Sequence, residues 1–266
     1  MPDIHATAVV HEKAKVADDA VIGPYAIIGA EVEIGVGARI AAHAVIDGAT
    51  RIGRNVQVFP FASIGSAPQD KKYRGERSTV TIGDDVVIRE YVTVNPGTEG
   101  GDMTTVVGDR CLLMIGSHVA HDCVVGDDVI VGNNVLLGGH VRVETFAILS
   151  GGAAVHQFCR IGRHAMIGGL TGVERDVIPY GQAMGNRARL TGLNLIGLKR
   201  RGFERSVVQD LRTAYRLLFA EEGTLAERVE DVKRRFGEVE AVKEVIDFIE
   251  ADSSRSFCQP HPGGEA

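Results

Sequence analysis

Aliphatic residues recur at every sixth position along most of this chain. Isoleucine or valine occupies each sixth position over residues 4–64, and the pattern resumes over 82–94 and, shifted by one residue, over 107–173. A second small or branched residue lies two positions earlier in most of these hexads, and glycine often follows the aliphatic residue. A period of six with two inward positions fits neither an amphipathic helix nor an alternating strand. It predicts a solenoid in which each hexad forms a short strand and a turn, and three hexads form one triangular coil.

Two segments interrupt the period. Residues 66–81 form a polar insertion, and residues 96–105 form a second one that is rich in glycine. Loops inserted into a rigid scaffold are favoured places for functional residues. We therefore expect these two insertions to contribute to any site on the solenoid.

The period changes to helical spacing after about residue 193. Three helices are expected, at 206–222, from 224 to about 237, and at 238–251. Gly223 is placed as a helix stop, and Thr224 with Glu227 forms a capping-box pattern. We expect a mainly β chain: a left-handed parallel β-helix of hexapeptide repeats over 1–190, then a C-terminal α-helical cap over 191–266 with a loose tail from 252.

Composition narrows the classes of function. The net charge of −6 gives no sign of nucleic-acid or membrane-surface binding. No apolar run approaches the ~18 residues of a membrane span, and residues 1–19 lack the apolar core of a signal peptide. We expect a cytoplasmic protein without disulfides. Cys111, Cys123 and Cys159 occupy the small inward position, which predicts core packing rather than nucleophilic chemistry, and Cys258 in the polar tail carries no signal.

The stacking of coils places polar residues in columns. Residues eighteen apart share a column, because a coil contains three hexads. Two adjacent columns consist of His121, Gly139 and Gln157, and of Asp122, His140 and Phe158, while His118 and His156 lie in the same coils. Four histidines thus gather on one face, with a glycine above His121 where a side chain would block approach. This arrangement predicts a site.

Two chemistries fit that cluster. Histidines on a solenoid hold zinc in gamma-class carbonic anhydrases; alternatively, His121 oriented by Asp122 acts as a general base. A zinc hydratase does not need the polar insertion or the basic stretch at 186–205, which has six cations against one Glu, a local charge of +5 (6 − 1). We favour the base. The basic stretch is either a solvated helix start or a docking patch for phosphates or an acidic carrier protein.

These residues resemble the family of acyl-[acyl-carrier-protein]–UDP-N-acetylglucosamine O-acyltransferases, which perform the first committed step of lipid A synthesis. The resemblance covers essentially the whole chain. Its specific stretches are Phe61–Tyr73, Leu113–Cys123, Gly138–Val141, Ala154–Cys159 and Gly197–Phe203.

The resemblance implies a direct, single-step acyl transfer with no covalent enzyme intermediate, the acyl group arriving on the phosphopantetheine of acyl carrier protein. We expect no other cofactor, and no metal, because the basic and polar segments already supply partners for phosphate and carbonyl groups. His121 would remove the proton from the glucosamine 3-hydroxyl, Asp122 would orient His121, and the Gly139 N–H would stabilise the oxyanion. Residues matching positions that contact the substrates are Asp70, Lys72, His118, His140, His156, Gln157, Asn194 and Arg200. The resemblance also implies a homotrimer with active sites in the grooves between subunits.

The acyl-chain length is expected to depend on Gly169 and Arg187. The family position matching Gly169 limits the acyl groove, so glycine there implies a long 3-hydroxyacyl chain. This chain departs from the family pattern at Pro96, Ile196 and Arg187, which replace an arginine, an acidic residue and a histidine.

Other interpretations also fit the sequence. The acceptor could be a 3-amino sugar nucleotide, giving an amide through the same catalytic residues. The related N-acyltransferase of the pathway carries a further N-terminal uridine-binding domain that this chain lacks. A zinc hydratase or a non-enzymatic scaffold is less favoured.

Overall fold

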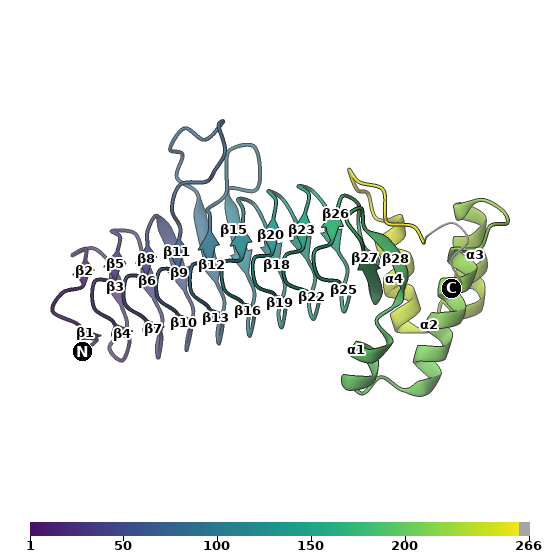
Figure 1. Ribbon diagram of the computed structural model, residues 1–266, viewed down its shortest axis with the longest axis horizontal. Coiled ribbons are helices and arrows are strands. Elements are labelled where there is room, and N and C mark those ends of the chain that lie inside the picture. Colours follow the sequence, from purple (N-terminus) through teal and green to yellow (C-terminus); the bar gives the residue numbers. More distant parts are fainter. Residues whose placement is uncertain (261–266) are drawn as a thin grey trace.

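The computed structural model describes residues 1–260. The chain winds into a left-handed parallel β-helix whose short strands stack in three sheets, with a group of helices at its C-terminal end (Figure 1). Sheet A contains β1 (Asp3–Ile4), β4 (Val21–Ile22), β7 (Arg39–Ile40), β10 (Gln57–Val58), β13 (Val87–Ile88), β16 (Leu112–Leu113), β19 (Ile130–Val131), β22 (Ile148–Leu149), β25 (Met166–Ile167), β27 (Gly181–Met184) and β28 (Arg189–Leu193).

The other two sheets complete the triangular section. Sheet B contains β2 (Val9–Val10), β5 (Ile27–Ile28), β8 (Val45–Ile46), β11 (Ser63–Ile64), β14 (Thr93–Val94), β17 (His118–Val119), β20 (Leu136–Leu137), β23 (Ala154–Val155) and β26 (Gly172–Val173). Sheet C contains β3 (Lys15–Val16), β6 (Glu33–Ile34), β9 (Ala49–Ile52), β12 (Thr79–Ile82), β15 (Thr104–Val107), β18 (Val124–Val125), β21 (Arg142–Val143) and β24 (Arg160–Ile161).

Strand register explains the shift of phase in the sequence. A regular coil pairs residues eighteen apart, as Asp3 with Val21. The first insertion lengthens this offset to thirty, as between strands β10 and β13, which adds two hexads and preserves the phase. The second lengthens it to twenty-five, as between β14 and β17, which adds seven residues and moves the pattern by one. Both insertions leave the corner between sheets B and C, and Figure 1 shows them side by side above the coils.

The core of the β-helix is formed by the side chains at the two inward positions of each hexad, as the sequence predicts. The aliphatic position and the small position before it are buried from the second coil onward; Ala20 and Ile22, for example, are 0% and 1% exposed. Cys111, Cys123 and Cys159 fill small positions in this core. Burial raises the pKa of these three thiols to about 12, so they are inert fillers, as predicted.

The described part of the C-terminal cap contains four helices, one more than the sequence predicted. They are α1 (Leu195–Arg200), α2 (Arg205–Leu218), α3 (Leu225–Phe236) and α4 (Glu240–Glu250). The capping box is present: the Thr224 N–H donates to the Glu227 carboxylate at 2.7 Å, and the Glu227 N–H donates to the Thr224 hydroxyl at 3.3 Å. The unexpected helix is α1, whose six residues are too short for helical periodicity to be detected. None of the four has the length and hydropathy of a membrane span.

The segment after α4 is bound rather than loose as far as residue 260. Cys258 is fully buried, and its N–H donates to the Asp176 carbonyl at 2.7 Å. The expectation of a loose tail is therefore wrong for 252–260, because this segment pairs with residues 70 and 81 positions earlier, in the bridges Leu190–Pro260 (260 − 190) and Asp176–Phe257 (257 − 176). The remainder, residues 261–266, lies outside the described part of the chain.

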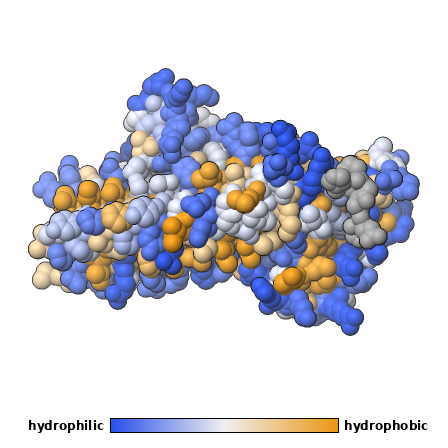
Figure 2. All heavy atoms as spheres, viewed as in Figure 1, coloured by the Kyte–Doolittle hydropathy of each residue, from blue (hydrophilic) through white to orange (hydrophobic). Residues whose placement is uncertain are grey.

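The surface of the insertions is polar, whereas apolar side chains are scattered along the coils (Figure 2).

Candidate active site

The corner between sheets B and C carries the two predicted columns. His121 and Asp122 lie in the turn between β17 and β18, and Gly139 with His140 occupies the same turn one coil later. Backbone hydrogen bonds join successive turns, from the His140 N–H to the His121 carbonyl and from the Phe158 N–H to the Gly139 carbonyl, both 3.0 Å. The structure therefore brings these residues together as the eighteen-residue coil requires.

Glycine at 139 is required by the position of His121. A Cβ atom added at Gly139 would lie 2.5 Å from both Cε1 and Nε2 of the imidazole. Any larger residue would push the ring away. In addition, the Gly139 N–H donates to no acceptor among the described residues.

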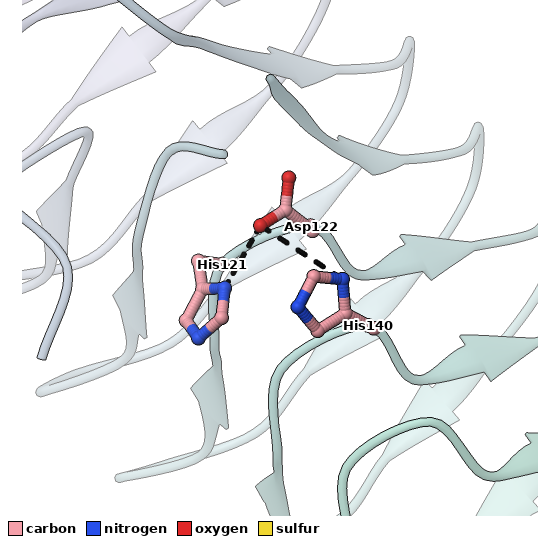
Figure 3. A group of neighbouring side chains, drawn as sticks. All are labelled: His121, Asp122 and His140. Atoms are coloured by element: carbon pink, nitrogen blue, oxygen red, sulfur yellow. Dashed lines mark hydrogen bonds and ion pairs between the residues drawn. The ribbon is translucent and has the colours of Figure 1, made fainter. Parts of the chain in front are cut away.

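His121 and Asp122 form a hydrogen-bonded pair. The imidazole Nδ1 lies 2.8 Å from the Asp122 Oδ2, and Figure 3 shows the rings of His121 and His140 on the same side of this carboxylate. Asp122 adopts a left-handed backbone conformation (φ 59°), which turns its side chain inward, where it is 0% exposed. A carboxylate acceptor places the proton on Nδ1 and leaves the Nε2 lone pair free to accept a proton.

The glycine-rich insertion holds Asp122 in place. The Thr98 hydroxyl donates to Oδ2 at 2.7 Å, and the Thr98 N–H lies 3.1 Å from both carboxylate oxygens. The Asp122 N–H in turn donates to the Thr105 hydroxyl at 2.9 Å. Burial alone would raise the pKa of Asp122, but the hydrogen bonds from Thr98 and His121 outweigh it and lower the pKa. Neither threonine was predicted as a site residue, although the insertion containing Thr98 was marked as a favoured place for function.

Burial favours the neutral forms of the neighbouring histidines. Burial, with a smaller effect from the charge of His121, lowers the pKa of His118, whose Nδ1 lies 2.7 Å from the Thr93 hydroxyl. Burial also lowers the pKa of His140, although Asp122 opposes this. The His140 ring stacks on Phe158 at a centroid distance of 4.4 Å.

A groove of about 820 Å³ runs along the outer face of sheet B; we call it the sheet B groove. Predicted site residues that line it are His118, His121, Gly139, His156 and Gln157. Gln69, Thr93 and Asn95 also line it and were not among the predicted residues. Asp122 and His140 line a second, polar hollow of about 440 Å³ on the other side of the same corner.

The similarity of this chain to curated relatives identifies its family. A chain from Caulobacter vibrioides named acyl-[acyl-carrier-protein]–UDP-N-acetylglucosamine O-acyltransferase is 48% identical over 257 residues, 97% of this chain and 98% of that one. A chain of the same name from Thermodesulfovibrio yellowstonii is 46% identical over 97% of this chain and all of that one. This chain belongs to that family of acyltransferases.

Family models and a solved structure agree. A model described as UDP N-acetylglucosamine O-acyltransferase, domain 2, matches residues 176–258, and a bacterial transferase hexapeptide model matches 104–139. The crystal structure of Francisella novicida UDP-N-acetylglucosamine acyltransferase superposes with a TM-score of 0.94 at 38% identity, covering 98% of this chain and 95% of that chain. The predicted fold and family are therefore confirmed.

Other predicted residues of this acyltransferase lie on the first insertion and at the start of the helical cap. The charge of Asp70 still acts on the site, since it opposes the lowering of the His140 pKa. Asp70 and Lys72 belong to the polar insertion, where the Lys72 N–H donates to the Asp70 carboxylate at 2.9 Å. Arg200 is exposed in the last turn of α1. Asn194 is 8% exposed and caps α1: its Oδ1 accepts from the Gly197 N–H, and its Nδ2 donates to the His164 carbonyl, both at 3.0 Å.

The two residues expected to limit the acyl chain follow strands of sheet A near the C-terminal end of the β-helix. Gly169 follows β25 at the corner between sheets A and B, and a Cβ there would meet only the Gly151 carbonyl, at 3.4 Å. Arg187 lies in the β27–β28 turn, 3.5 Å from the carboxylate of Glu174. Since Glu174 lines the sheet B groove, Arg187 is placed near its C-terminal end.

The departures from the family pattern have distinct settings. Pro96 is buried at the start of the insertion that holds Asp122. Ile196 is 69% exposed on α1, an unusual exposure for so apolar a side chain.

The donor atoms at this corner lie close enough together to form a candidate metal site. The ligand atoms of His121, Asp122 and His140 lie within 4.8 Å of one another. Both Asp122 oxygens already accept hydrogen bonds from Thr98, and Oδ2 accepts one from His121 as well. A metal ion would compete with these donors, so the arrangement fits a general base better than a metal ligand set.

Proposed function

We propose that this acyltransferase moves a 3-hydroxyacyl group from acyl carrier protein to the glucosamine 3-hydroxyl of UDP-N-acetylglucosamine, the first step of lipid A biosynthesis. The relatives' names supply the donor and acceptor. The observation that carries the mechanism is the hydrogen-bonded His121–Asp122 pair, whose imidazole lies against Gly139, a residue whose N–H donates to no acceptor among the described residues.

The reaction needs one proton acceptor and one oxyanion site. Nε2 of His121 takes the proton of the sugar hydroxyl as its oxygen attacks the thioester carbon, and Asp122 stabilises the resulting imidazolium. The Gly139 N–H donates to the oxyanion of the tetrahedral intermediate. Collapse breaks the carbon–sulfur bond, and the departing thiolate takes the proton back from His121. No resident cofactor is needed, because the acyl group is activated by its phosphopantetheine thioester.

We propose that the complete site lies between subunits of a homotrimer. The catalytic pair is on the corner between sheets B and C, whereas Asn194 and Arg200 follow sheet A at the end of the β-helix. A groove between neighbouring subunits would combine the two sets. We place the protein in the cytoplasm, since its four cysteines are free and buried.

The reaction is tested with purified protein, 3-hydroxyacyl carrier protein and either UDP-N-acetylglucosamine or its 3-amino analogue. We expect an O-linked ester from the natural sugar nucleotide, identified by mass spectrometry, and its loss in His121→Ala. Product formed only from the 3-amino analogue would instead assign the amide-forming reaction, and absence of either product would refute the proposed function.

Subunit mixing tests the shared site. His121→Ala and Arg200→Ala trimers, each impaired alone, are unfolded and refolded together. If one site uses His121 of one subunit and Arg200 of another, random assembly restores about one quarter of the sites. No recovery in mixed trimers of verified composition would place both residues in the same subunit's site.

A further inference from the structure

The segment after α4 returns to the last coils of the β-helix and is fixed on both sides of Arg255. Ahead of it, the Ser253 hydroxyl donates to the Asp176 carboxylate at 2.8 Å. Beyond it, the Asp176 N–H donates to the Ser256 carbonyl at 2.9 Å, and Cys258 is fully buried. Figure 1 shows this segment (yellow) reaching the coils near β26. Arg255 is therefore held in a defined place, not on a free end.

The Arg255 side chain contacts a residue that lines the sheet B groove. Its Nη2 lies 2.8 Å from Nδ1 of His156, a residue that lines the groove together with His121. A guanidinium has no acceptor, so this bond requires Nδ1 to carry the lone pair. The same nitrogen lies 3.2 Å from the Gln157 carbonyl, a contact that would need the opposite assignment. The shorter contact, to a charged donor, is the stronger one.

Two histidines in one groove thus adopt opposite tautomers, because one is paired with an anion and the other with a cation. The carboxylate of Asp122 places the proton of His121 on Nδ1 and leaves Nε2 as a base. The guanidinium of Arg255 leaves the proton of His156 on Nε2, so that this ring presents an N–H donor.

We propose that Arg255 is a positioning residue, which fixes His156 as an Nε2–H hydrogen-bond donor toward a substrate oxygen in the groove. Its role in substrate binding rests on the acyl-transfer function proposed above. Without the guanidinium the exposed His156 ring is free to rotate and to exchange tautomers, so binding must then order it at a cost in affinity. The C-terminal segment thereby contributes to a site whose histidines come from the coils.

The tautomer is tested by nitrogen-15 NMR of histidine-labelled protein at alkaline pH, with His156 assigned by its absence in His156→Gln. In wild type we expect an unprotonated Nδ1 whose resonance is displaced by an accepted hydrogen bond. Arg255→Met, similar in length but without donors, should lose that displacement, and Arg255→Lys should restore it in part. A protonated Nδ1 in wild type, or an unchanged resonance in Arg255→Met, would overturn the assignment.

Steady-state kinetics tests the consequence for the reaction. Arg255→Met should raise the KM of one substrate about tenfold while kcat changes less, and Gln259→Ala, an exposed position in the same segment, should match wild type. In a His156→Gln background Arg255→Met should add little, because its effect passes through His156. An equal loss in both backgrounds would refute the positioning role. Inactive wild-type protein would instead count against acyl transfer and leave the NMR result to judge Arg255.

Discussion

Replacing Gly139 with alanine tests the geometry of the active site with one methyl group. The added Cβ would lie 2.5 Å from Cε1 and Nε2 of His121. Non-bonded carbon atoms settle about 3.5–4.0 Å apart, so the imidazole must retreat by about 1 Å. The Gly139 carbonyl and the turn itself are unaffected, since Gly139 is not among the glycines with positive φ.

A displacement of this size has a predictable effect on the rate. Misplacing a catalytic group by about 1 Å costs on the order of 10²-fold, which corresponds to about 2.7 kcal/mol of transition-state stabilisation. We expect Gly139→Ala to lower kcat by that factor with 3-hydroxyacyl carrier protein and UDP-N-acetylglucosamine at saturation. Stability should not fall in parallel, because glycine-to-alanine changes at compatible positions restrict the unfolded chain.

A matched control separates this effect from general damage. At Gly151 a Cβ would meet only backbone atoms of Asn133, the nearer being its carbonyl oxygen at 3.3 Å, and no catalytic side chain. Gly151→Ala should therefore keep activity close to wild type. If Gly139→Ala folds with an unchanged Tm and its kcat stays within fivefold of wild type, then the imidazole is not constrained by Gly139 and the reasoning fails.

Four further predictions concern the same molecule. Thr98→Val, which removes the hydroxyl bond to Asp122 but keeps the N–H, should lower kcat about tenfold, since a hydrogen bond to a charged group contributes about 1.5–3 kcal/mol; wild-type kcat would exclude an anchoring role. Exhaustive chelation should leave activity intact, and loss of activity together with stoichiometric zinc would restore the hydratase interpretation. Gly169→Met should shift the preference in a panel of acyl carrier proteins toward shorter chains, each lost buried methylene being worth about 0.8 kcal/mol; an unchanged length profile would refute it. Burial, and to a lesser degree the nearby charges of Arg163 and Arg201, lowers the pKa of His164 to about 4. Unfolding therefore takes up a proton at His164, and the free energy of unfolding should fall as the pH drops from about 6.5 toward 4. In denaturant titrations at several pH values, His164→Phe should reduce the slope of this free energy against pH by the equivalent of about one proton.

The periodic part of the chain was predictable because its neighbours are fixed by counting. Once a coil has eighteen residues, Gly139 must lie over His121 and His140 over Asp122, as the backbone bonds between successive turns confirm. The core follows for the same reason, since the aliphatic and small positions keep their phase wherever an insertion adds whole hexads.

The remaining features depend on contacts that no period encodes. Thr98 reaches Asp122 from an insertion whose path is set by its own turns. The family resemblance predicts that Asn194 contacts a substrate. In the folded chain, however, its side-chain amide accepts from the Gly197 N–H at the start of α1 and donates to the His164 carbonyl. Arg255 meets His156 across ninety-nine residues, through a segment without regular secondary structure. Such long-range partners require the folded coordinates.

The strand reversal at the C-terminal end of the β-helix also has a consequence for fibre formation. Coils add to one another by parallel pairing, and a solenoid with an open end is a template for another copy. Here β28 runs antiparallel to β27, and its Leu190 N–H is taken by the Gln259 carbonyl. Leu190 is bridged by Pro260, whose backbone has no N–H to offer. In sheet C, Val177 forms a bridge with Ile161 of the last strand, β24. In sheet B, the Gly172 N–H of the last strand, β26, donates to the Gly185 carbonyl. The last strands of sheets B and C are therefore covered as well. This end of the molecule is therefore closed to end-to-end elongation, and concentrated protein should resist growth into filaments through it.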